Sequence, residues 1–168
     1  VYQSNIFNLN YLENLKIEDY FNIIEKMKLI LKKYGDQEIK KISSTNSDKK
    51  IKIGFVTADF RKHAVGFQVF DVIKNLAKNN DFELYAYYND NNEDILTENF
   101  KLLFKSWVNI FFMDNVQVIE KVKQDNIKIL IDLSGYTVGN RIEVFFNKPA
   151  QIQVSWAGYL ASTGLKEV

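Results

Sequence analysis

Five short apolar segments alternate with amphipathic segments over residues 51–158, and this alternation limits the possible folds more than any other feature. The apolar segments, which predict strands, are residues 51–59, 82–89, 107–112, 128–134 and 152–158. The helical patterns between them lie near residues 66–78, 94–105, 115–125 and 140–147. This spacing is typical of βαβ units, and strands that are apolar on both faces need helices on both sides. The sequence therefore predicts an α/β, Rossmann-like, doubly wound parallel sheet with residues 51–59 in its middle.

The part of the chain before this alternation reads differently. Apolar side chains recur there at steps of three and four, on one face of an amphipathic helix: Ile17, Phe21, Ile24, Met27, Leu31 and Tyr34. Gly35 follows where a C-cap glycine belongs. Residues 36–50 are polar and predict a linker. We thus expect a helical segment over 1–35, a linker over 36–50 and a Rossmann-like unit over 51–168.

Composition excludes several kinds of chemistry. The 168 residues include no cysteine and one histidine, which excludes disulfides, thiolate catalysis and metal sites that need cysteine or two histidines. The net charge is +1, so no overall field points to nucleic acid. No apolar run reaches the roughly 18 residues of a membrane span, and no signal peptide pattern opens the chain. A cytoplasmic location is therefore expected. The chain lacks an initiator methionine and stops abruptly at Val168, so we expect a piece of a longer polypeptide.

Ligands of open parallel sheets bind outside the carboxyl ends of the strands, so the candidate site lies in the loops that follow them. Three loops stand out: residues 59–66, 134–141 and 158–164. Together they hold five of the seven glycines and the histidine. The loops after the second and third strands look like plain Asn/Asp connections. No G-x-G-x-x-G, G-x-x-x-x-G-K-[ST] or G-x-S-x-G pattern occurs, which argues against a dinucleotide site, a P-loop and a hydrolase elbow.

Each residue that stands out in these loops has two interpretations. His63 is either a surface or helix-capping side chain, or a general base or phosphate hydrogen-bond donor at a strand tip. Arg141 either holds an anion with its planar fork or is a solvated helix charge paired with Glu143. Gly135 and Gly158 either let a ligand approach the backbone or form ordinary turns.

Four short motifs in a fixed order carry a family resemblance. Residues 57–63 (TADFRKH) are similar to S-D-F-x-x-H, and residues 135–141 (GYTVGNR) to G-[YH]-T-x-G-x-R. Residues 148–153 (KPAQIQ) are similar to a run ending R-P-A-P-I-Q, and residues 156–162 (WAGYLAS) to W-x-G-Y-P-G-T. The chain thereby resembles the O-linked N-acetylglucosamine transferases and their SPINDLY-like relatives, and within them a bacterial member. Asn10, Tyr11 and the helix that follows are similar to the piece that joins tetratricopeptide repeats to the catalytic domain.

The resemblance implies the first of the two lobes of a GT-B glycosyltransferase. Its members move N-acetylglucosamine from UDP-N-acetylglucosamine to Ser or Thr hydroxyls of proteins, with inversion and without a metal or other cofactor; some relatives use another nucleotide sugar. The implied partners are the sugar donor and an acceptor protein or peptide. The implied catalytic residue is His63. The implied substrate-binding residues are Asp59, Gly135, Tyr136, Thr137, Arg141, Gly158, Tyr159, Ser162 and Thr163.

The chain also departs from this family. Leu160 and Ala161 stand in place of Pro-Gly, and Ala tolerates a positive φ poorly. The second lobe, which carries most nucleotide contacts in the family, is absent from residues 1–168, so we expect the isolated chain to be inactive. The alternatives are a non-catalytic nucleotide- or peptide-binding module and an inactive remnant. A receiver-like domain is disfavoured, because Asp59 is a single acid and no lysine follows the last strand before Lys166.

Overall fold

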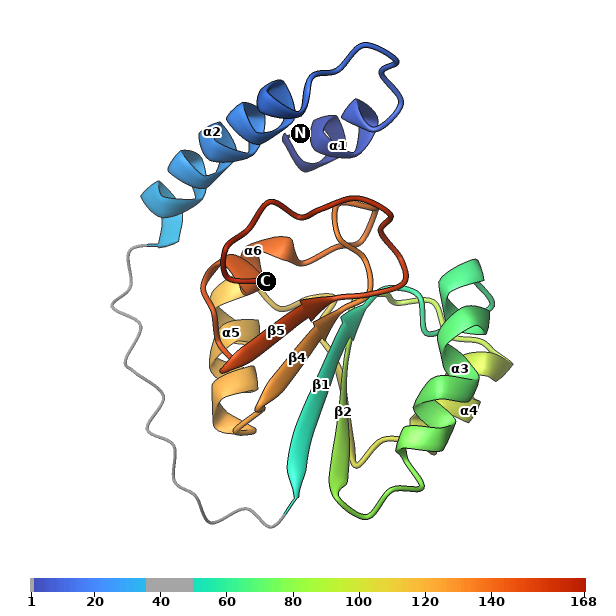
Figure 1. The fold of residues 1–168 in the computed structure, drawn as a ribbon. Coiled ribbons are helices and arrows are strands. Elements are labelled where there is room, and N and C mark those ends of the chain that lie inside the picture. The colour runs from blue at the N-terminus through green and yellow to red at the C-terminus, as the bar shows by residue number, and fades with distance from the viewer. Residues whose placement is uncertain (1, 36–49) are drawn as a thin grey trace.

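A computed structural model describes residues 2–35 and 50–168 of the chain (Figure 1). One sheet contains five strands: β1 (Ile51–Thr57), β2 (Phe82–Tyr88), β3 (Ser106–Asn109), β4 (Ile129–Asp132) and β5 (Ile152–Ser155). All neighbouring strands are parallel, and their order is β3-β2-β1-β4-β5. The predicted parallel sheet with its first strand in the middle is therefore confirmed. The predicted strands ran on into residues that instead form the loops at the carboxyl edge.

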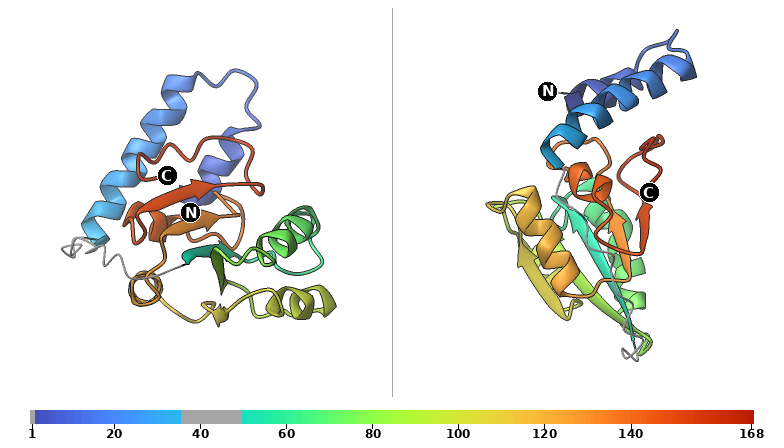
Figure 2. Two further views of the ribbon diagram at one scale, coloured as in Figure 1. Left: turned by 60° about the horizontal axis from the view of Figure 1, so that its bottom comes forward. Right: turned by 90° about the vertical axis from the view of Figure 1, so that its left-hand side faces the viewer.

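Four helices cover the two faces of this sheet (Figures 1 and 2). They are α3 (Ala64–Leu76), α4 (Ile95–Lys101), α5 (Asn115–Gln124) and α6 (Ile142–Phe146). Helices α3 and α4 pack on one face, and α5 and α6 pack on the other. Local sequence sets where α4 and α5 begin, because Asp94 and Asp114 each form a capping box with the residue three positions later. The prediction of helices on both faces is confirmed.

The face under α3 and α4 is packed largely with aromatic rings. Phe60, from the loop after β1, is fully buried and stacks on Phe100 of α4 with ring centroids 4.4 Å apart. Phe55 and Trp107 extend the same cluster. Aromatic pairs at such distances add about 0.5–1.5 kcal/mol each beyond the area they bury. This packing holds the start of the β1 loop against the sheet.

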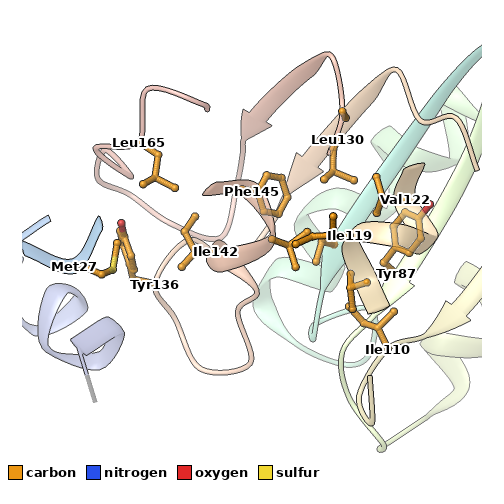
Figure 3. Close-up of a cluster of buried hydrophobic side chains, with 14 of the residues drawn as sticks. Met27, Tyr87, Ile110, Ile119, Val122, Leu130, Tyr136, Ile142, Phe145 and Leu165 are labelled. Atoms are coloured by element: carbon orange, nitrogen blue, oxygen red, sulfur yellow. The ribbon is translucent and has the colours of Figure 1, made fainter. Parts of the chain in front are cut away.

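The opposite face continues into two N-terminal helices, α1 (Tyr2–Leu9) and α2 (Ile17–Gly35). Figure 3 shows Met27 of α2 beside Tyr136 at one end of this cluster, and Val122 and Tyr87 at the other end. The sequence pattern predicted α2 but not α1. The predicted linker, residues 36–50, lies outside the described residues except for Lys50. Over the described ranges, no helix is both long enough and apolar enough to cross a bilayer.

The buried face of α2 is shifted from the predicted one. Ile24 and Met27 are buried as expected, but Ile17 and Phe21 remain 62% and 42% exposed. Tyr20 is buried in their place, because its hydroxyl reaches the loop after β5 and sets which side of α2 turns inward. The spacing of apolar residues alone could not predict this polar contact, so it placed the wrong side of α2 inward.

Candidate functional site

A cavity of about 800 Å³ lies at the carboxyl edge of the sheet, and we call it the strand-tip pocket. Residues after every strand line it, together with Phe7 and Asn8 of α1. The loop after β1 contributes most of the charged groups, and the loop after β4 contributes residues 136–140. The loops after β2 and β3, whose sequences looked like plain connections, contribute Asn89, Asp90 and Phe111. These residues were missed because nothing local marks a side chain as facing a cavity built by other loops.

The β1 loop, residues 58–63, carries a cluster of charged groups on one wall of the pocket. The Asp59 side chain is 8% exposed, and its Oδ1 lies 3.4 Å from Nδ1 of His63 and 3.8 Å from Nη2 of Arg61. Arg61 Nε also lies 3.1 Å from Oδ2 of Asp90, which follows β2. Burial raises the pKa of the Asp59 carboxyl, against the opposing effect of the His63 and Arg61 charges. The wall thus presents both signs of charge to a polar ligand.

The geometry of His63 agrees with both interpretations, that of a helix cap and that of a side chain at a strand tip. It is the N-cap of α3, with extended backbone (φ −141°, ψ 155°), and its Nδ1 accepts the Val65 N–H at 3.3 Å. The capping interpretation is therefore confirmed. Its side chain is also 40% exposed and lines the strand-tip pocket. The placement expected for an active-site histidine is present as well.

The β4 loop, residues 133–141, is shaped by a buried carboxylate that was not singled out from the sequence. Asp132 ends β4 and accepts the backbone N–H groups of Ser134 at 3.0 Å and of Gly135 at 2.8 Å. Its Oδ2 also accepts the Ser155 hydroxyl at 3.1 Å. Burial raises the pKa of Asp132, although these hydrogen bonds act to lower it. An acid that ends a buried strand and is followed by Leu-Ser-Gly is the sequence signal that marks this turn.

The glycines of these loops make close contacts with the protein itself. Gly135 has a φ of +55°, and a Cβ built on it would lie 2.3 Å from Cβ of Tyr159. A Cβ on Gly158 would lie 1.9 Å from the Leu133 carbonyl oxygen. The turn interpretation fits both positions, because the protein itself fills the direction in which a Cβ would point. Gly158 nonetheless lines the strand-tip pocket, whereas Gly135 does not touch it.

Predicted substrate-binding residues in the β5 loop, residues 156–164, are used to hold the N-terminal helices. The Tyr159 hydroxyl lies 3.0 Å from the Tyr20 hydroxyl, which donates to the Ser162 carbonyl oxygen at 2.6 Å. Thr163 is buried, and its carbonyl oxygen accepts the Tyr136 hydroxyl at 2.7 Å. None of the three predicted side chains in this loop, those of Tyr159, Ser162 and Thr163, lines the strand-tip pocket. Their expected contact with substrate stays a prediction.

The predicted residues of the β4 loop divide in the same way. Tyr136 lines the pocket but is 2% exposed, so most of its ring belongs to the core. Thr137 also lines the pocket, and its hydroxyl donates to the Ser134 carbonyl oxygen at 2.7 Å. The backbone of this loop is thus tied down before any ligand arrives.

Arg141 is hydrogen-bonded to neighbouring loops, through partners that neither of its two interpretations included. Its Nε donates to Asn89 Oδ1 at 3.0 Å, and its Nη1 donates to Asn115 Oδ1 at 2.9 Å. Its Nη2 donates to the carbonyl oxygens of Ile110 and Met113, each at 2.9 Å. The guanidinium therefore joins the loops after β2, β3 and β4. Its expected contact with an anion stays a prediction. The asparagines that receive it gave no signal in the sequence, because isolated asparagines are common in loops.

The Leu160-Ala161 departure does not strain the backbone. Among the described non-glycine residues, positive φ values occur at Asn126, Lys148 and Ala157, and not at Ala161.

The described residues also include no group of three or more His, Asp or Glu side chains that could hold a metal ion.

Comparisons with known proteins agree with this architecture. The sequence model of glycosyl transferase family 41 matches residues 14–166. A UDP-N-acetylglucosamine–peptide N-acetylglucosaminyltransferase of Caenorhabditis elegans is 33% identical over 127 residues, which are 72% of this chain and 11% of that protein. The probable enzymes SEC of Arabidopsis thaliana and SPINDLY of Oryza sativa are 32% and 30% identical, over 69% and 73% of this chain. The chain spans only 11–14% of the length of these relatives.

A solved structure matches nearly the whole chain. A mutant of the Thermobaculum terrenum O-GlcNAc transferase superposes with a TM-score of 0.83 at 25% identity, over 99% of this chain and 32% of that one. The match includes the sheet, the strand-tip loops and the four motifs. Because the family model covers most of the sequence and the fold agrees, the chain belongs to glycosyl transferase family 41.

Proposed function

We propose that this chain forms one lobe of an inverting glycosyltransferase that moves N-acetylglucosamine from UDP-N-acetylglucosamine to Ser or Thr hydroxyls of proteins. Family membership and the names of the relatives support the reaction class. The observation that carries the assignment is the strand-tip pocket, which brings Asp59 and His63 of one motif to the same edge of the sheet as Thr137 and Gly158 of two others.

In the proposed reaction, the acceptor hydroxyl oxygen bonds to the anomeric carbon while the bond to the UDP oxygen breaks. The hydroxyl gives its proton to a base or to solvent water, and UDP leaves with the bonding electron pair. His63 is the exposed polar group on the pocket wall that is best placed to meet either reacting oxygen, since Asp59 is nearly buried behind it. A positioned acid, base or hydrogen-bond donor contributes about 10²–10⁴-fold to such a step.

The remaining parts of the enzyme are proposed to lie outside residues 1–168. We assign most contacts with the uridine and the diphosphate to a second lobe, because the chain covers 32% of the matched structure. We assign α1 and α2 to the junction with tetratricopeptide repeats, and the whole protein to the cytoplasm. Neither a metal nor another cofactor is needed in this proposal.

The test is transfer of labelled N-acetylglucosamine from UDP-N-acetylglucosamine to acceptor peptides by the product of the complete gene. We expect transfer that persists in EDTA and that falls at least about 100-fold in His63→Ala. The isolated chain is expected to show no transfer and, by titration calorimetry, weak UDP binding at most. Tight UDP or peptide binding without transfer by the complete protein would instead favour the binding-module alternative.

A further inference from the structure

In the single histidine of the chain, one ring nitrogen contacts both a hydrogen-bond donor and an acceptor. Nδ1 of His63 accepts the Val65 N–H at 3.3 Å and also lies 3.4 Å from Oδ1 of Asp59. The first contact requires a lone pair on Nδ1, and the second favours a proton there. A neutral imidazole carries only one proton, so the two contacts select different tautomers.

The geometry favours the contact with the helix. The Val65 N–H belongs to the first turn of α3 and has no intrahelical acceptor, so it depends on the N-cap side chain. His63 has the extended backbone of an N-cap, and the Val65 contact is a directed hydrogen bond. The Asp59 contact is only an ion-pair distance, and the same Oδ1 is shared with Nη2 of Arg61 at 3.8 Å.

We propose that the N-terminus of α3 fixes neutral His63 as the Nε2–H tautomer, so that the strand-tip pocket receives a hydrogen-bond donor and not a general base. In the described part of the chain, both contacts of the ring are made by Nδ1, which leaves Nε2 for a bound molecule. The partner of Nε2–H is an oxygen acceptor, either on the sugar diphosphate or on the acceptor hydroxyl. This donor role rests on the proposed function, whereas the tautomer does not.

Nuclear magnetic resonance tests the tautomer without any activity. Residues 1–168 contain one histidine, so a long-range ¹H–¹⁵N spectrum of the ¹⁵N-labelled 168-residue chain contains one imidazole pattern. In the complete protein, the His63 pattern is the one that is missing from the spectrum of His63→Gln. At alkaline pH, where imidazole is neutral, we expect the Nε2 resonance of a protonated nitrogen and the Nδ1 resonance of an unprotonated one. Protonation on Nδ1 would overturn the proposal whether or not the protein transfers sugar.

Three substitutions then separate donor, base and cap in the complete protein. The amide nitrogen of Gln lies the same number of bonds from Cβ as Nε2, so His63→Gln keeps a donor but cannot accept the proton. His63→Ala lacks both the donor and the cap. His63→Asn restores a strong N-cap but places no group at the Nε2 position.

For a donor, we expect His63→Gln to transfer sugar within about 10-fold of the wild type, and His63→Ala and His63→Asn to lose about 10²–10³-fold. Thermal melts should show His63→Asn as the most stable of the three variants. Equal losses in His63→Gln and His63→Ala would overturn the donor role. If the wild type transfers no sugar, the proposed function fails, and the spectrum alone still decides the tautomer.

Comparing the kinetic constants for the two substrates identifies the oxygen that Nε2–H meets. A rise in KM for UDP-N-acetylglucosamine in His63→Asn places the donor on the sugar diphosphate. A rise in KM for the acceptor peptide places it on the hydroxyl. Both outcomes support a donor, whereas a fall in kcat that His63→Gln does not restore contradicts one.

Discussion

The β1 loop and the β5 loop lie at the same edge of one sheet, and both carry family motifs, yet they do different work. The β1 loop buries Phe60 and leaves His63 40% exposed on the strand-tip pocket. The β5 loop uses Tyr159 and Ser162 to bind the N-terminal helices. A match to a motif therefore identifies a loop that the fold needs, and the side chains around it decide whether it meets a ligand.

The position of each strand explains the difference. β1 is central, so loops from both neighbouring strands surround its tip and leave a cavity between them. β5 is at the edge, and the loop that follows it is covered by another part of the chain. Helices α1 and α2 provide that cover over the β5 loop (Figure 2). The β5 loop, which contains Trp156 and Tyr159, therefore packs against other parts of the protein.

The largest expected effect is on activity and comes from the β1 loop. His63→Ala should lower transfer by about 10²–10³-fold in the complete protein. It should cost only about 1 kcal/mol of stability, because it removes a single helix cap. Steady-state transfer and chemical denaturation measure the two halves. Wild-type turnover in this variant would show that His63 of the β1 loop contributes nothing to catalysis, and it would contradict the difference between the two loops.

The next effect is on stability and comes from the β5 loop. Tyr159→Ala removes a ring that packs edge-on against Tyr136 with centroids 5.5 Å apart and fills the space beside Gly135. We expect a loss of about 3 kcal/mol, from removal of a large and partly buried aromatic side chain. Tyr159→Phe is the matched control and should keep most of the stability. A Tyr159→Ala protein that melts like the wild type would show that this loop is not a structural anchor.

Arg141→Lys tests the connection between the two regions. Lysine cannot reproduce the planar fork that reaches Asn89, Asn115 and two carbonyl oxygens at once. We expect a loss of about 2 kcal/mol and faster amide hydrogen exchange over residues 110–113. Unchanged exchange there would mean that the loop after β3 holds its place without the guanidinium.

The smallest effect should come from the hydroxyl that joins α2 to the β5 loop. Tyr20→Phe removes hydrogen bonds to the Tyr159 hydroxyl at 3.0 Å and to the Ser162 carbonyl oxygen at 2.6 Å. The expected loss is about 1 kcal/mol in a thermal melt. Tyr11→Phe is the control, because Tyr11 is 73% exposed and its substitution should change stability by less than about 0.5 kcal/mol. Equal melting temperatures of the two variants would show that the Tyr20 hydroxyl does not stabilise the docking of α2.

The amino-acid sequence by itself determined the alternation of strands and helices, the central place of β1 and the strand-tip position of His63. These follow from local patterns, since the period of apolar residues sets each element and parallel strands bring their carboxyl ends to one edge. The motif resemblance likewise depended only on residues near one another in the chain. The family and the α/β fold could therefore be predicted before any coordinates.

Only the tertiary structure decided which side chains meet a ligand and which meet the protein. The pairing of Tyr20 with Tyr159 spans 139 positions, and that of Arg141 with Asn89 spans 52. No local period encodes such pairs, because they form when separate elements pack and each buried polar group takes the nearest partner. For the same reason the sequence did not predict that Asn89 and Phe111 line the pocket. The contacts of His63 Nδ1 with Val65 and Asp59 are local in the sequence, but they depend on the conformation that the β1 loop takes in the folded protein.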